Sequence, residues 1–142
     1  MAKKIGAGGE PQNYDESNGQ YEKDIYDHYK WAVENGFISS LIDLSTYKKI
    51  YRRLNKIAIG KKAADGTIIK HITFHCLDRV CGTTEKPKGI KHEGVDLKDF
   101  EDTLFNGRVR KLEKTNTIIF ISKKCKIAND PTTGVIKQCN RL

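Results

Sequence analysis

The sequence predicts an α+β fold, in which N-terminal helices pack on a C-terminal antiparallel β-meander of three to five strands. The main observation is a change of hydrophobic period near Arg108. Before this point apolar residues recur at helical spacing, and after it they alternate with polar ones, as in half-buried strands. Short turn sequences separate the strand-like runs. Helices that precede strands in this way are typical of α+β domains.

Four stretches carry the helical pattern: 23–35, 46–56, 72–82 and 96–106. Side chains that cap helix starts support three of them, because Ser45, Thr73 and Asp96 precede the apolar stripes. Glycine after the stripe marks the ends, at Gly36 and Gly82 among others. We therefore expect the helices to begin and end near these residues.

The strand pattern occupies four runs after the last helix: 108–114, 117–122, 124–129 and 135–140. The sequence from Asp130 to Gly134 is a strong turn signal between the last two runs. Earlier in the chain, Asp65-Gly66 predicts a tight turn before a short strand at 67–71. The C-terminal runs therefore predict the meander.

Length and composition indicate a single folded domain. Residues 1–22 are rich in Gly, Asn and Pro and are expected to form a flexible linker or arm, and residues 23–142 the α+β domain. No apolar run approaches the roughly 18 residues that span a membrane, so we expect no membrane association. The residues after Lys3 and Lys4 lack the apolar region of a secretory signal.

The positive charge of the chain is concentrated in its body. Of a net charge of +8, residues 1–45 contribute 4 Lys against 8 Asp and Glu, and residues 46–142 contribute 22 Lys and Arg against 10 Asp and Glu. A body this basic attracts polyanions, and nucleic acid is the commonest of these. A solvated charged face with no such role is the alternative interpretation.

The cysteine pattern favours free thiols and gives no metal site. Cys76, Cys81, Cys125 and Cys139 form no CxxC motif, so we expect buried, reduced thiols. His71 and His75 lie near two of them, but the spacing matches no structural zinc pattern, because adjacent helical residues diverge by about 100°. We therefore predict neither a metal nor another cofactor.

The candidate catalytic residues lie on the short helix at 72–82. His75 and Arg79 are four residues apart, so they project from one face of that helix. Histidine transfers protons near neutral pH, and arginine donates a planar fork of hydrogen bonds to phosphate. The alternative is an ordinary surface histidine and an arginine paired with a carboxylate such as Glu101. His71 is a reserve candidate for proton transfer.

Three motifs in a fixed order resemble a known group of nucleases. They are His75-x-x-x-Arg79, the helix start Gly94-Val95-Asp96-Leu97-x-Asp99-Phe100, and Asn129-Asp130-Pro131-x-Thr133-Gly134. Over about residues 57–140 the chain resembles the small nuclease domains found at the C-termini of bacterial polymorphic toxins and in some phage proteins. These belong to the barnase–EndoU–colicin–RelE-like RNase group.

The resemblance implies a metal-independent ribonuclease that cleaves cellular RNA, such as tRNA, through attack of the ribose 2′-OH. It implies that His75 acts as base or acid and Arg79 as a phosphate clamp. Candidate substrate contacts are Lys70, Arg108, Arg110, Lys123, Lys124 and Gln138. The chain departs from the group in having no arginine within 116–120, a role for which Arg108, Arg110 or Lys114 could substitute.

The resemblance also implies a cellular setting. A toxin domain of this kind acts in the cytoplasm, is delivered as part of a larger secreted or phage protein, and is neutralised by an acidic immunity protein or antitoxin. Two alternatives stay open from the sequence. One is a non-catalytic nucleic-acid-binding or phage accessory protein that retains the fold, and the other is a protein-interaction module.

Overall fold

The computed structural model describes residues 19–82 and 93–142 of the chain. Most of the predicted arm, residues 1–18, and residues 83–92 therefore lie outside the described residues. The helices and strands, in chain order, are α1 (Gly19–Glu34), α2 (Leu44–Ala58), β1 (His71–Ile72), α3 (Phe74–Cys81), α4 (Leu97–Asn106), β2 (Arg108–Leu112), β3 (Thr117–Ile121), β4 (Cys125–Asp130) and β5 (Val135–Arg141). The predicted α+β fold is confirmed.

The strands form one sheet in the order β1-β5-β4-β3-β2. Strands β2 to β5 pair antiparallel in sequence order, which is the predicted meander. β1 lies at the edge of the sheet and pairs in parallel with β5, with His71 opposite Val135. The whole sheet is therefore mixed. In place of the predicted strand at 67–71, the structure has the two-residue strand β1, His71–Ile72, and an isolated bridge between Lys62 and Ile68.

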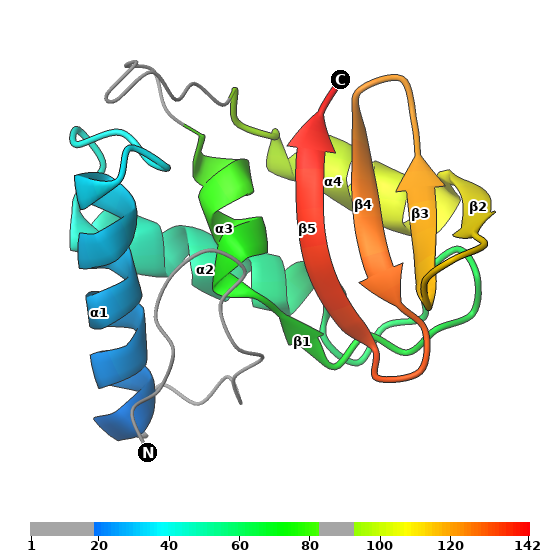
Figure 1. Ribbon diagram of the computed structural model, residues 1–142, viewed down its shortest axis with the longest axis horizontal. Coiled ribbons are helices and arrows are strands. Elements are labelled where there is room, and N and C mark those ends of the chain that lie inside the picture. The colour runs from blue at the N-terminus through cyan, green and yellow to red at the C-terminus, as the bar shows by residue number, and fades with distance from the viewer. Residues whose placement is uncertain (1–18, 83–92) are drawn as a thin grey trace.

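α4 and α2 lie behind the sheet, α3 and α1 lie beside it past β5, and the front face of the strands is open (Figure 1). α4 crosses behind β3 and β4, and α2 lies behind α3 and β1. Side chains that point from the sheet into this layer are buried, including Phe120, Ile127 and Cys139. Side chains of the alternate set point to the open face, as the period of two requires.

The first two helices begin at residues other than those predicted. α1 starts at Gly19 because Tyr21 is buried and stacks on Tyr51 with ring centroids 6.4 Å apart. α2 is capped by Asp43 and not by Ser45, since the Asp43 carboxylate accepts a hydrogen bond from the Thr46 backbone N–H. The predicted cap was wrong because a better-placed acceptor lies two residues earlier.

The ends of the two later helices agree with the sequence. The Thr73 side chain accepts from the backbone N–H of Cys76 at the start of α3, and Gly82 ends the helix with φ 64°. Asp96 caps α4 by accepting from the backbone N–H of Lys98. Within the described residues, no helix combines the length and the apolar character needed to cross a membrane.

The turn before β5 depends on a glycine at a close contact. Gly134 has φ 73°, and a Cβ atom placed on it would lie 2.5 Å from the carbonyl oxygen of Ile68. Its own carbonyl accepts from the backbone N–H of Lys70 at 2.8 Å. The turn therefore presses directly on the segment that leads into β1, where no side chain fits.

This contact predicts a difference between two glycine substitutions. Gly66 has φ 92° but open space around it, so Gly66→Ala carries only the cost of a left-handed backbone, about 1 kcal/mol of unfolding free energy. Gly134→Ala adds the clash with Ile68 and is expected to cost about 2–3 kcal/mol. Urea unfolding followed by circular dichroism measures both. Equal losses would show that the close contact is not important.

Candidate active site

One residue, Thr73, fixes the start of α3 to the first part of β5. The Thr73 hydroxyl donates to the carbonyl oxygen of Lys137 at 2.8 Å, and the Thr73 backbone N–H donates to the carbonyl oxygen of Ile136 at 3.1 Å. Because β1 is parallel to β5, α3 then continues alongside the rest of β5. The helix therefore replaces β1 as the neighbour of β5 from this point on.

A buried polar cluster holds the opposite side of α3. Asp78 is fully buried, and its two carboxylate oxygens contact His28 Nε2 at 2.7 Å and the Tyr47 hydroxyl at 2.6 Å. The three residues come from α3, α1 and α2. Removing one partner of such a buried set is costly, because it leaves the other polar groups unpaired. This cluster therefore fixes the rotation of α3 about its axis.

The face of α3 turned to the open side of the sheet carries His75 and Arg79. Arg79 Nη1 donates to Asn140 Oδ1 at 2.6 Å, and the side chain of Gln138 hydrogen-bonds to His75. His75 Nδ1 is buried and has no hydrogen-bond partner in the described part of the chain. The structure thus brings together His75, Arg79 and Gln138, three of the residues predicted from the sequence.

The two contacts line up because helix and strand repeats match. Four residues of helix rise about 6 Å, and two residues of strand span about 6.6 Å. Two rows of cross-strand partners therefore run from the helix across the open face. His75 heads a row of Gln138, Ala128, Ile119 and Arg110, and Arg79 heads a row of Asn140, Lys126, Ile121 and Arg108.

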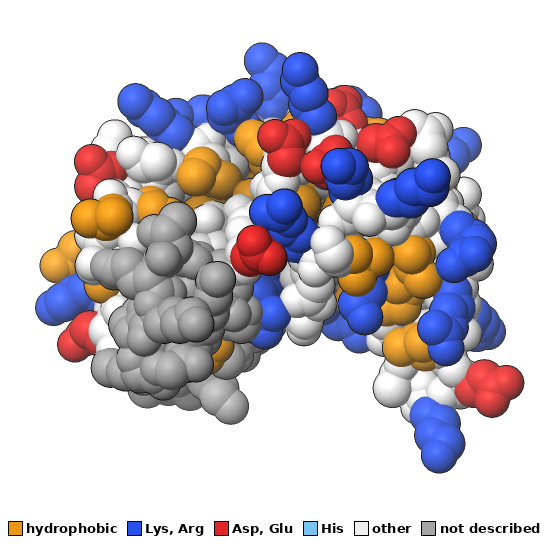
Figure 2. All heavy atoms as spheres, turned by 90° about the horizontal axis from the view of Figure 1, so that it is seen from above, with side chains coloured by type: hydrophobic (Ala, Val, Ile, Leu, Met, Phe, Trp, Pro, Cys, Tyr) orange, Lys and Arg blue, Asp and Glu red, His pale blue; other side chains and the backbone are white. Residues whose placement is uncertain are grey.

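An open hollow of about 380 Å³ lies on this face beside the two contacts. Its lining mixes apolar, amide and basic side chains: Leu112, Thr117, Ile119, Lys126, Ala128, Lys137, Gln138 and Asn140. Figure 2 shows hydrophobic side chains bordered by Lys and Arg side chains at the sheet end of the molecule. Such a surface suits a ligand with flat apolar groups and negative charges.

Lys137 reaches this hollow through an irregularity in β5. The register shifts between Ala128 and Asn129, which pair with Gln138 and Ile136 and leave Lys137 as the extra residue of a β-bulge. Its Nζ donates to the Thr117 hydroxyl at 2.6 Å. The bulge carbonyl is the same group that accepts from Thr73. One irregular residue therefore both receives the helix start and adds a cation to the hollow.

The environment of His75 favours its neutral form. Burial lowers the pKa of His75 below its ordinary value of 6.5, and the Arg79 guanidinium lowers it further. The buried Asp78 carboxylate and the hydrogen bond that the His75 ring donates to the Gln138 side chain raise the pKa and so oppose these effects. The ring can therefore accept a proton at neutral pH, as a general base must.

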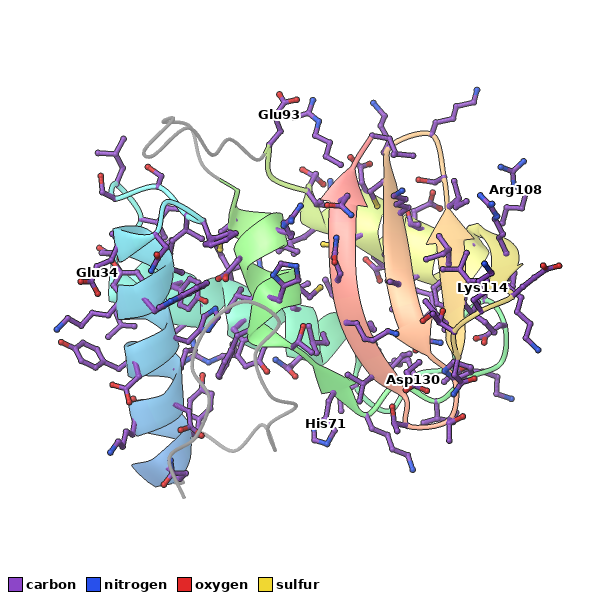
Figure 3. The ribbon with its side chains drawn as sticks, viewed as in Figure 1. Glu34, His71, Glu93, Arg108, Lys114 and Asp130 are labelled. Atoms are coloured by element: carbon purple, nitrogen blue, oxygen red, sulfur yellow. The ribbon has the colours of Figure 1, made fainter. Side chains whose placement is uncertain are left out.

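The other predicted contacts lie farther from His75. Arg110 and Arg108 are on β2, three strand spacings from β5, which is about 14 Å. Figure 3 shows Arg108 at this outer edge of the sheet. Lys70 lies at the turn before β5, while Lys123 and Lys124 lie at the turn beside its other end. These five cations surround the open face and do not converge on His75.

Several residues of the hollow were not predicted from the sequence. Lys126 could have been found, because strand alternation puts it on the same face as Ala128. Asn140 and Lys137 carried no such signal, since their places depend on the bulge and on the contact with α3. Asn140 matters most, because it orients the Arg79 guanidinium.

The cysteines are free and lie away from this face. Cys76, Cys125 and Cys139 are buried and Cys81 is partly buried. The Cys139 thiol contacts the carbonyl oxygen of Cys76 at 3.7 Å on the core side of α3, so His75 and Cys76 point in different directions. In residues 19–82 and 93–142, no three His, Cys, Asp or Glu side chains are grouped to hold a metal ion.

Comparisons of the chain with protein-family models, with curated proteins and with solved structures give no match. The functional argument therefore depends on the chemistry of the site itself.

The opposing effects on His75 predict two shifts of opposite sign. Arg79→Gln removes a cation and should raise the pKa of His75, whereas Gln138→Leu removes a hydrogen bond to the charged ring and should lower it. NMR titration of the His75 ring protons measures both midpoints against the unmodified protein, whose midpoint is expected below 6.5. Shifts of the same sign in both variants would contradict the arrangement.

Proposed function

We propose that the protein is a metal-independent endoribonuclease toxin domain that cleaves cellular RNA, such as tRNA, by attack of the ribose 2′-OH on the adjacent phosphate. The observation that carries the proposal is the pairing of His75 and Arg79 with Gln138 and Asn140 at the edge of a basic open face. A proton acceptor and a phosphate-binding cation thereby lie side by side. The resemblance of the chain to toxin nucleases points the same way.

In the proposed reaction, the neutral ring of His75 takes the proton of the 2′-OH on the nitrogen that carries no hydrogen. The 2′ oxygen then forms a bond to phosphorus, and the bond from phosphorus to the 5′ oxygen breaks. The products are a 2′,3′-cyclic phosphate and a 5′-OH end, so no metal or other cofactor is required. Arg79, held by Asn140, would balance the negative charge that builds on the phosphate oxygens. Lys137 and Lys126 are the nearest further cations of the hollow.

The rows across the sheet suggest how RNA would lie. Bases would rest on the apolar part of the open face around Ile119 and Ala128. Arg108 and Arg110, about 14 Å from β5, would contact phosphates away from the cleaved one. Lys70, Lys123 and Lys124 would hold the backbone at the two ends of β5. In this arrangement the predicted cations contribute to binding and not to bond cleavage.

A non-catalytic nucleic-acid-binding or phage accessory protein is the second candidate. One observation favours it: the described lining of the hollow, which His75 adjoins through Gln138, contains no histidine of its own and no carboxylate that could protonate the leaving oxygen. A lysine or a water molecule would have to supply that proton. The two candidates share the RNA contacts and differ only in the cleavage step.

The cellular setting belongs to the proposal as well. The domain would act in the cytoplasm, where its RNA substrate lies, after delivery as part of a larger secreted or phage protein. An immunity protein or antitoxin that blocks it would be acidic, because the body of the chain is strongly basic.

The proposal predicts cleavage of RNA in the presence of EDTA. Purified protein incubated with total RNA should give fragments with cyclic-phosphate ends, and His75→Ala should slow cleavage by at least about a hundredfold. Fragments are separated on denaturing gels and their ends identified by mass spectrometry. The rate should fall with pH below the pKa of His75, because the protonated ring cannot act as base.

His71→Ala is the matched control, since it removes a histidine four residues earlier at the lower edge of the molecule (Figure 3). It is expected to keep cleavage near the level of the unmodified protein. Binding without cleavage at any protein concentration would reject the ribonuclease and leave the second candidate. Failure to bind RNA at low salt would reject both.

A further inference from the structure

A second basic hollow lies on the helical layer, between α2 and α4. Its volume is about 430 Å³, and its lining has four cations, one carboxylate and two aliphatic side chains: Arg53, Lys56, Lys61, Lys98, Glu101, Ile57 and Leu97. Figure 1 shows α2 and α4 behind the sheet, so this hollow faces away from the open face that carries His75. We call it the rear hollow.

The cations of the rear hollow lack internal partners. In the described part of the chain, Arg53, Lys56 and Lys98 take part in no side-chain hydrogen bond or ion pair, and Lys61 contacts only the carbonyl oxygen of Ile57, at 3.4 Å. Like charges gathered around one concavity repel each other and destabilise the fold slightly. A bound polyanion would remove that cost.

The lining favours phosphate groups over a protein surface. Strong protein interfaces have buried aromatic or arginine anchors at their centre. No aromatic side chain lines the rear hollow, and its one arginine, Arg53, is exposed. Phosphate backbones are instead held by exposed Lys and Arg side chains on shallow surfaces. Four of the seven lining residues of the rear hollow are cations, so this surface would contact mainly the phosphate backbone.

We propose that the rear hollow is a second phosphate-binding surface, which holds the backbone of a folded RNA while another part of the same RNA lies on the open face. The inference rests on the proposed function and narrows its substrate. A short single strand on the open face cannot also reach the far side of the helical layer, whereas a folded RNA can wrap around the edge of the molecule. The substrate class is therefore structured RNA of about tRNA size.

The test compares two triple substitutions in the full chain. Arg53→Gln/Lys56→Gln/Lys98→Gln removes three cations from the rear hollow, and Lys23→Gln/Lys30→Gln/Lys49→Gln removes three exposed cations from elsewhere on α1 and α2. Binding of labelled tRNA is measured between low and moderate salt in a His75→Ala background. Cleavage of tRNA and of a dinucleotide is measured with His75 intact.

We call the variant with three substitutions in the rear hollow the rear variant. The plot of log affinity for tRNA against log salt concentration should become less steep by about two to three units in this variant, because about one unit is lost per phosphate contact. Its binding of tRNA at moderate salt should be at least about tenfold weaker. It should raise KM for tRNA and leave dinucleotide cleavage unchanged. The control variant should change the slope by less than about one unit. Arg53→Lys, which keeps the charge, should bind tRNA as the unmodified protein does.

Each contrary outcome has a separate meaning. An unchanged slope in the rear variant, or the same loss in both triple variants, overturns the rear hollow as an RNA site even if tRNA and dinucleotide are cleaved. Binding of polyglutamate, a model of an acidic protein surface, is measured in the same variants. If the rear variant loses polyglutamate binding and keeps tRNA binding, the rear hollow is a site for an acidic protein and the RNA proposal is overturned. A slope lost in the rear variant alone, with no cleavage by the unmodified protein, supports the rear hollow and rejects the ribonuclease.

Discussion

The open face depends on the junction between Thr73 and the irregular part of β5. The Thr73 hydroxyl donates to the bulge carbonyl of Lys137, and its oxygen accepts from the first turn of α3. The Thr73 side chain therefore satisfies two backbone groups. One is the Cys76 N–H, which has no partner within the helix, and the other is the Lys137 carbonyl, which the bulge takes out of the strand pairing. Because α3 and β5 are joined at this point, one turn of the helix stays aligned with two residues of the strand. His75 therefore lies opposite Gln138, and Arg79 lies opposite Asn140.

The second constraint is the polar cluster behind α3. Asp78 lies one residue before Arg79, so on a helix the two side chains point about 100° apart. Burying Asp78 against His28 and Tyr47 therefore directs Arg79 and His75 toward the sheet. The cluster also ties α1 to the site, which explains why a helix far from the open face belongs to the same domain.

Local signals gave most of the fold and only part of the site. Caps at Thr73 and Asp96, the turn at 130–134 and the strand periods were visible in sequence because each depends on neighbours within a few residues. The pair of His75 and Arg79 was visible for the same reason. Asn140 and the bulge at Lys137 were not, because they depend on contacts more than 60 residues apart in sequence. The cap of α2 was missed because two capping residues, Asp43 and Ser45, competed.

The last strand has a consequence for the order in which the site assembles during folding. Both partners of the α3 pair, Gln138 and Asn140, lie on β5, and so does the carbonyl that receives Thr73. These contacts join residues more than 60 positions apart, so forming them costs loop-closure entropy that the local caps of α3 do not cost. The helix can therefore form early, whereas His75 and Arg79 take their final orientation only once β5 has paired with β4.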